Sequence, residues 1–105
     1  MLFFKLGVKF NSNVYTDAML HAIQTVYGRR NLDATITSAN DSTHGPHSYH
    51  MQDRALDVRF WNVPEVDRVF VKQQLQSALP GFYDVVQESD HFHIEADAVK
   101  EKAGQ

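Results

Sequence analysis

Two separate segments of this chain hold the side chains that could do chemistry. The first runs from Ser48 to Asp57 and contains an imidazole, His50, in addition to the carboxylate at its end. The second, Asp90–His93, adds a carboxylate and two imidazoles. A catalytic zinc ion uses three such ligands and keeps a water, with its pKa lowered to about 7, in the fourth position. Together the two segments therefore have the residue types of a hydrolytic zinc site.

The composition limits which metal ligands and which partners are open to this chain. Its 105 residues include no cysteine, so a bound metal would have to use imidazole and carboxylate rather than thiolate. The net charge is -3 and the ten basic residues are scattered, which argues against a nucleic-acid partner. No stretch approaches the roughly 20 apolar residues of a membrane span. The first ten residues are interrupted by lysines, so we expect no export signal of the chain's own.

Apolar periodicity predicts the elements that would position these side chains. With 43% hydrophobic residues, the chain can form one compact core, so we expect a single domain over residues 1–105. Residues 3–10 alternate as a half-buried strand does, and residues 14–27 have helical spacing, with Asn13 as N-cap and Gly28 as the C-terminal stop. We also expect strands at 34–37, 54–61, 83–87 and 91–95, a helix from Pro64 to Pro80, and a short helix or disorder over 96–105.

Two of the predicted strands have one apolar face and one polar face. The apolar faces carry Leu56, Val58 and Phe60 in one strand, and Phe92 and Ile94 in the other. The polar faces carry Ala55, Asp57 and Arg59 in the first strand, and His91, His93 and Glu95 in the second. We therefore expect an α+β domain, a small antiparallel sheet with helices on one face and a metal cleft on the other. The polar loop of residues 38–53 would add His50 to that cleft.

The spacing in both segments resembles that of the M15 family of zinc D-Ala-D-Ala carboxypeptidases and peptidoglycan endopeptidases. Ser48-x-His50-x-x-Asp53-x-Ala55-x-Asp57 is similar to the family's SxHxxGxAxD signature, and Asp90-His91-Phe92-His93 is similar to its second motif. The similarity covers roughly residues 35–95. It implies a Hedgehog/DD-peptidase-like fold and a bound Zn²⁺.

The resemblance also implies a role for most of these residues. It makes zinc ligands of His50, Asp57 and His93. Asp90, three residues before the last ligand, takes the place of the general base that activates the zinc-bound water. His91 would stabilise the charge that develops on the substrate carbonyl.

The substrate side of the site and one alternative assignment stay open. We expect Ser48 and Arg59 to contact substrate, with Ser48 as an orienting residue rather than a nucleophile. The second motif also permits an assignment in which His91 is the ligand and Glu88, again three residues earlier, is the base. We favour the first assignment.

The chain departs from the family pattern at two places. Asp53 stands where the family has a glycine and the backbone would approach closely. The arginine that commonly follows the strand before the motif loop, where it can bind a substrate carboxylate, is absent from residues 38–41. Arg59 or Arg54 could replace it. The bond that is cut therefore stays open.

From these observations we expect a monomeric zinc metallopeptidase that hydrolyses peptidoglycan stem peptides. It would act as a D,D-carboxypeptidase or as an L-alanyl-D-glutamate-type endopeptidase. The short chain resembles the compact catalytic domains that phages use in lysis or tail entry, which would place it in the host cytoplasm on its way to the wall, or in the virion. The alternative is a non-catalytic zinc-binding or structural domain. Asp53 and the missing arginine favour that alternative, and the intact base and ligand set oppose it.

Overall fold

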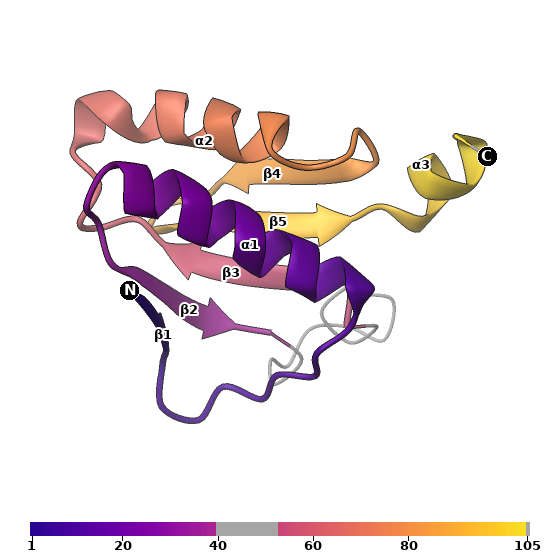
Figure 1. The fold of residues 1–105 in the computed structure, drawn as a ribbon, viewed down its shortest axis with the longest axis horizontal. Helices are drawn as coiled ribbons and strands as arrows, with labels where there is room; N and C mark the ends of the chain where they lie inside the picture. Colours follow the sequence, from indigo (N-terminus) through magenta and orange to yellow (C-terminus); the bar gives the residue numbers. More distant parts are fainter. Residues whose placement is uncertain (40–52, 105) are drawn as a thin grey trace.

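Five strands and three α-helices follow one another in residues 1–39 and 53–104, which the computed structural model describes. In chain order they are β1 (Leu2–Phe4), α1 (Val14–Arg29), β2 (Ala34–Ser38), β3 (Ala55–Arg59), a 3₁₀ turn η1 (Glu65–Asp67), α2 (Arg68–Ser77), β4 (Tyr83–Gln87), β5 (His91–Ala96) and α3 (Ala98–Ala103). The strands form one sheet in the order β1-β2-β3-β5-β4 (Figure 1). The predicted α+β class is confirmed.

The sheet is mixed, so the prediction of a purely antiparallel sheet is wrong. β1 pairs with β2 in parallel, whereas the β2–β3, β3–β5 and β4–β5 pairs are antiparallel. Parallel neighbours need a crossover connection of a dozen or more residues, usually a helix. Here α1 is that connection, because it carries the chain back before β2 begins (Figure 1).

The N-terminal strand is much shorter than the alternation of residues 3–10 predicts. The chain turns after Phe4, where the Val8 amide donates to the Lys5 carbonyl at 3.1 Å. Gly7 has a φ of 92°, a left-handed conformation that no regular strand contains. Leu6, expected on the buried face, is 99% exposed. The turn at Gly7 therefore overrides the local alternation.

Helix α1 begins as predicted and ends later than predicted. The Asn13 side chain accepts from the Tyr15 and Thr16 amides, which confirms the N-cap. Gly28 lies inside the helix instead of ending it. The left-handed residue that stops the helix is Asn31, with a φ of 56°, and its amide donates to the Gly28 carbonyl at 3.1 Å. Asparagine thus fills the position that glycine most often occupies after a helix.

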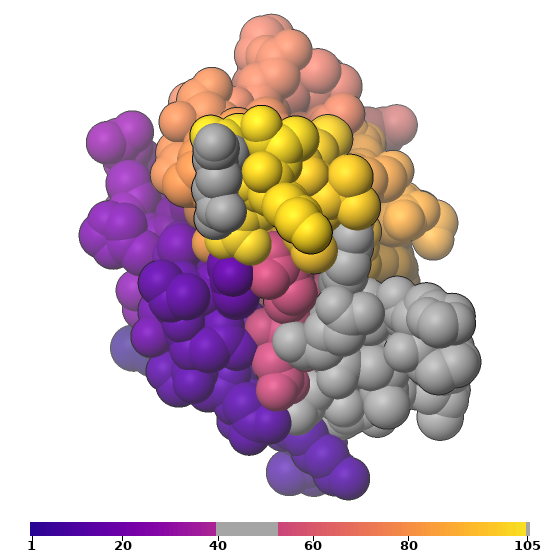
Figure 2. Space-filling view, turned by 90° about the vertical axis from the view of Figure 1, so that its right-hand side faces the viewer, coloured from indigo at the N-terminus to yellow at the C-terminus, as the bar shows by residue number. Residues whose placement is uncertain are grey.

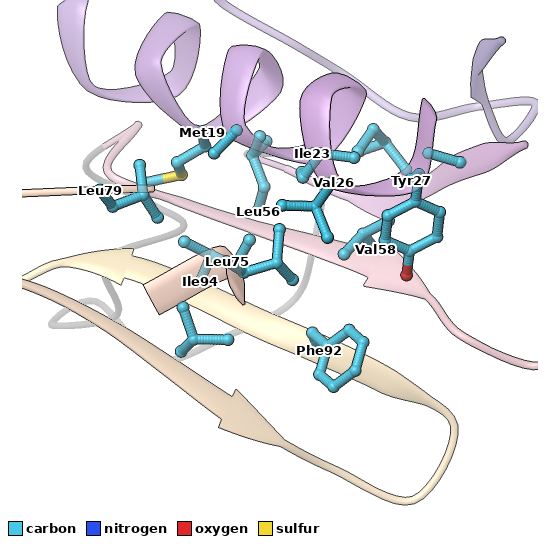
Figure 3. Packing of buried hydrophobic residues seen from close by; sticks show 14 of the residues in the cluster. Met19, Ile23, Val26, Tyr27, Leu56, Val58, Leu75, Leu79, Phe92 and Ile94 are labelled. Atoms are coloured by element: carbon cyan, nitrogen blue, oxygen red, sulfur yellow. The ribbon is translucent and has the colours of Figure 1, made fainter. Parts of the chain in front are cut away.

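Helices α1 and α2 pack on the same face of the sheet, and the core lies between them and the strands (Figure 3). The buried side chains that meet there include Met19, Ile23, Val26, Tyr27, Leu56, Val58, Leu75, Phe92 and Ile94. The apolar face predicted for the second helix is partly wrong, because Val66, Val69 and Phe70 are exposed. This helix begins only at Arg68, after the 3₁₀ turn, and it buries Leu75, as its apolar spacing predicts, together with Val71.

Candidate metal centre

The two motif segments meet because β3 and β5 are antiparallel neighbours. The register pairs Asp57 with His93, and Arg59 with His91. Leu56, Val58, Phe92 and Ile94 of these strands belong to the core under the helices, so the polar residues between them lie on the opposite face. Two of the three predicted zinc ligands are therefore direct cross-strand neighbours. The third, His50, and the expected substrate contact Ser48 lie outside the described residues.

The donor atoms of Asp57 and His93 are close enough to hold one ion. Oδ1 of Asp57 lies 2.9 Å from Nδ1 of His93, and Asp57 is only 7% exposed. Two ligands of a tetrahedral zinc ion, each about 2.0–2.1 Å from the metal, lie about 3.3 Å apart. A small separation of the two side chains would thus admit the ion, so the donor types and their spacing fit zinc.

A buried hydroxyl next to this pair also supports a bound ion or water. Ser38, on β2, is the cross-strand partner of Asp57 at a β-bulge. Its Oγ is buried and has no hydrogen-bond partner among the residues that the structure describes. Buried polar atoms of this kind are normally satisfied, and a bound water or ion is a common partner.

His93 is held between two carboxylates. Its Nδ1 faces Asp57, and its Nε2 lies 2.8 Å from Oε1 of Glu95. Burial on its own would lower the pKa of His93, but the hydrogen bonds and charges of Asp57 and Glu95 outweigh it and raise the pKa above the ordinary histidine value. Without a metal, this raised pKa favours the form of His93 that carries a proton on both ring nitrogens.

The predicted catalytic residues, His91 and Asp90, lie next to Asp57 on the same side of the sheet. Nε2 of His91 lies 3.7 Å from Oδ2 of Asp57, and Nδ1 of His91 lies 2.6 Å from Oδ1 of Asp90. The side chain of Asp90 is 80% exposed in the turn before β5. Carboxylates and imidazoles thus alternate across β3 and β5, and we call these residues the acid–imidazole row: Asp90, His91, Asp57, His93 and Glu95.

The alternative assignment, with His91 as ligand and Glu88 as base, has less support from the geometry. The register places His93, not His91, opposite Asp57. The Glu88 amide donates to the His91 carbonyl at 2.9 Å, but no hydrogen bond joins the Glu88 side chain to another described residue. The register therefore pairs Asp57 with His93, the ligand of the first assignment, and the choice between Asp90 and Glu88 as base stays a prediction.

A polar depression of about 270 Å³ lies beside the acid–imidazole row. It is lined by Lys5, Thr37, Asp57, Arg59, Asp90 and His91. Arg59, predicted to contact substrate, lines this depression, and among the described residues its guanidinium contacts the Trp61 ring and no carboxylate. Lys5 was missed, because the parallel β1–β2 pair that brings it here, through the bond from its amide to the Ile36 carbonyl at 2.8 Å, has no local sequence signal.

Arg54, the other arginine considered for binding a substrate carboxylate, already makes contacts within the protein. Its Nε donates to the Ala96 carbonyl at 2.9 Å, its Nη2 donates to Glu101 at 3.1 Å, and its guanidinium stacks 3.9 Å from the centroid of the Tyr15 ring. Figure 2 shows the yellow C-terminal segment directly above the start of β3 and beside the indigo N-terminal part of the chain. Arg54 therefore holds α3 against the domain, and its guanidinium is not available to bind a substrate carboxylate.

Asp53 keeps the backbone conformation for which the family's glycine is suited. Its φ is 56°, in the left-handed region, which aspartate tolerates better than most residues. Asn13 donates from Nδ2 to the Asp53 carbonyl at 2.8 Å, and Asn11 donates to the Asp53 carboxylate at 3.3 Å. The left-handed turn into β3 thus forms with an aspartate, whose carboxylate accepts from the segment before α1.

A second group of acids adjoins the row at Glu95. Carboxylate oxygens of Asp84, Glu95 and Asp97 lie within 4.8 Å of one another and could hold a metal ion. Lys100 already places its Nζ 2.5 Å from Asp84, and Glu95 bonds to His93. The group is therefore largely engaged by its own neighbours.

Comparison with known proteins adds no family assignment. No family model and no curated protein matches this chain. In the described part of the chain, none of the helices has the length and apolar character needed to cross a membrane.

Proposed function

We propose that this protein is a zinc-dependent peptidase that hydrolyses peptidoglycan stem peptides. The observation that carries the proposal is the cross-strand pair of Asp57 and His93, whose donor atoms lie 2.9 Å apart beside an exposed carboxylate and a polar depression. His50, Asp57 and His93 would hold the metal. Bound zinc would polarise the scissile carbonyl and lower the pKa of its water.

Asp90 would carry out the proton transfers, and His91 would stabilise the oxyanion. The Asp90 side chain is 80% exposed, and its only side-chain contact among the described residues is with His91, so it could take a proton from the attacking water and give it to the leaving amine. His91 lies between Asp90 and Asp57, where its ring can donate a hydrogen bond to the oxyanion that forms on the substrate carbonyl.

The depression suggests how the substrate is oriented. Lys5 and Arg59 bring two cations to its wall next to the row. Stem peptides carry carboxylates, and an arginine can bind one through two parallel hydrogen bonds. This supports either a D,D-carboxypeptidase or an L-alanyl-D-glutamate-type endopeptidase. Phage lysis or entry is the setting that the family resemblance suggests.

The first test is the zinc content of purified wild-type protein beside two single variants, His93→Ala and His21→Ala. His21 is exposed on α1 and serves as the matched control. We expect about one zinc per chain in the wild type and in His21→Ala, and none in His93→Ala, as a site with three protein ligands requires. No zinc in the wild type, after zinc has been supplied, would overturn the proposal.

The second test separates catalysis from metal binding. Asp90→Ala should keep its zinc and lose peptidoglycan hydrolysis by about 10²- to 10⁴-fold, the usual contribution of a general base, whereas Glu88→Ala should retain activity. Undiminished hydrolysis in Asp90→Ala would contradict the assigned base. Zinc binding by a wild-type protein that cleaves no stem peptide would instead favour the non-catalytic alternative.

A further inference from the structure

His93 is contacted at both ring nitrogens, and only one of them is needed for a metal. Nδ1 faces Asp57, whereas Nε2 bonds to Glu95, which belongs to neither motif as a ligand or base. We propose that Glu95 is a positioning residue that holds the His93 ring with Nδ1 toward the metal position. This inference rests on the proposed function, since it assumes that His93 is a zinc ligand.

The strand geometry places Glu95 where its carboxylate can reach the His93 ring. It follows His93 by two residues on β5, so both side chains lie on the same face of the sheet. The cross-strand partner of Glu95 is Ala55, which is buried and small. A larger side chain at this position would compete for the space next to Glu95. The Glu95 carboxylate can therefore turn back along the strand to His93.

The chemistry of imidazole explains why such a contact matters. A neutral histidine carries one ring proton, and the hydrogen bond made by one nitrogen decides which nitrogen is left to bind a metal. Glu95 accepts from Nε2–H, and this leaves the Nδ1 lone pair for the ion beside Asp57. Ligating histidines commonly have such a carboxylate partner. Without it, the ring is free to rotate and to offer the wrong nitrogen.

A simpler reading is that Glu95 acts only through its charge, as a member of the acidic group. Asp97 allows the two readings to be separated, because its carboxylate belongs to the same acidic group but its position lies beyond the end of β5. Asp97 also caps α3 by accepting from the Val99 and Lys100 amides. Asparagine is as good a cap as aspartate, so Asp97→Asn removes the charge and leaves the helix intact.

The test is the zinc affinity of the full chain, measured by chelator competition for wild type, Glu95→Gln, Glu95→Ala and Asp97→Asn. We expect Glu95→Ala to bind zinc about 10- to 100-fold more weakly, as loss of a partner of a ligating histidine usually causes. Glu95→Gln can still accept from Nε2–H and should fall between Glu95→Ala and the wild type. Asp97→Asn should bind like the wild type.

NMR of the histidine ring nitrogens in the zinc-loaded proteins gives a second readout. Nε2 of His93 should carry a slowly exchanging proton in the wild type, and that proton should exchange faster in both Glu95 variants. Equal affinity and an unchanged ring proton in Glu95→Gln, or an equal loss in Asp97→Asn, would overturn the positioning role alone. Failure of the wild type to bind zinc would overturn the proposed function and this inference together.

Discussion

At the scale of single residues, the zinc affinity should depend on pH, because His93 must lose a proton before it can bind the metal. Its pKa in the metal-free protein is raised, because the bonds to Asp57 and Glu95 outweigh burial. Zinc can bind only after Nδ1 has lost its proton, so affinity should fall about tenfold for each pH unit below that pKa. The decline should begin above pH 6.5, the ordinary histidine value. Chelator competition between pH 5 and 9 measures it, and a decline that begins only below the ordinary value would contradict the predicted shift.

Asp53 allows a second prediction at this scale, about the turn into β3. Because its φ is 56°, Asp53→Val should lower the free energy of unfolding by about 1–2 kcal/mol, the cost of a left-handed conformation for a residue with a Cβ branch. Asp53→Gly should change it little, since relief of strain offsets the greater freedom of the unfolded chain. Urea unfolding measures both. Equal stability of the valine and glycine variants would mean that the turn is not held in this conformation.

The sequence predicts part of the site well and another part poorly. Strand alternation puts Asp57 and His93 on the polar faces of two strands, whereas only the register shows that these strands are neighbours. The bond between His93 and Glu95 depends on side-chain rotamers, which a period of two does not specify. Lys5 depends on the pairing of β1 with β2, a contact between distant segments.

At the scale of helices and strands, Arg54 joins three parts of the chain that are far apart in sequence. Its side chain is only 12% exposed and contacts Tyr15 on α1, Ala96 at the end of β5 and Glu101 on α3. Arg54→Ala should therefore lower the free energy of unfolding by about 1–3 kcal/mol, since it removes the charge-assisted bond to Glu101 and the bond to the Ala96 carbonyl. Amide hydrogen exchange should become faster in α3 than in α1.

A double-mutant cycle with Glu101 tests whether this contact is the cause. Arg54→Ala and Glu101→Ala should be non-additive by about 0.5–3 kcal/mol, as contacting residues usually are. Lys102→Ala, an exposed change on the same helix, should be additive with Arg54→Ala. Additivity of the Arg54 and Glu101 changes would mean that the pair does not hold α3.

The elements themselves are predictable where local signals agree. The span of β4 and the start of α1 follow from apolar alternation and from the Asn13 cap. The prediction fails where a single backbone conformation decides, as at Gly7, which ends the first strand, and at Asn31, which ends α1. It also fails for α2, because the 3₁₀ turn before Arg68 changes which residues face the sheet.

At the scale of the whole molecule, the two faces of the sheet have different roles. The core lies between the sheet and the helices α1 and α2, whereas the acid–imidazole row lies on the other face of the same strands. The core residues, among them Leu56, Ile94 and Phe92, need no metal for their burial. The metal-free domain should therefore stay folded, unlike small zinc domains that unfold when the ion is removed.

Zinc should nevertheless add to stability, because it binds only the folded arrangement of Asp57 and His93. At a hundredfold excess over Kd the increment should be about 2.7 kcal/mol. His93→Ala should abolish it. Leu56→Ala, whose side chain lies on the opposite face of the strand that holds Asp57, should lose about 2–5 kcal/mol in core packing yet keep the full increment. Urea unfolding with and without zinc measures these values for all three proteins. Loss of the increment in Leu56→Ala would show that the two faces are energetically coupled, in which case metal affinity would depend on the core as much as on the ligands.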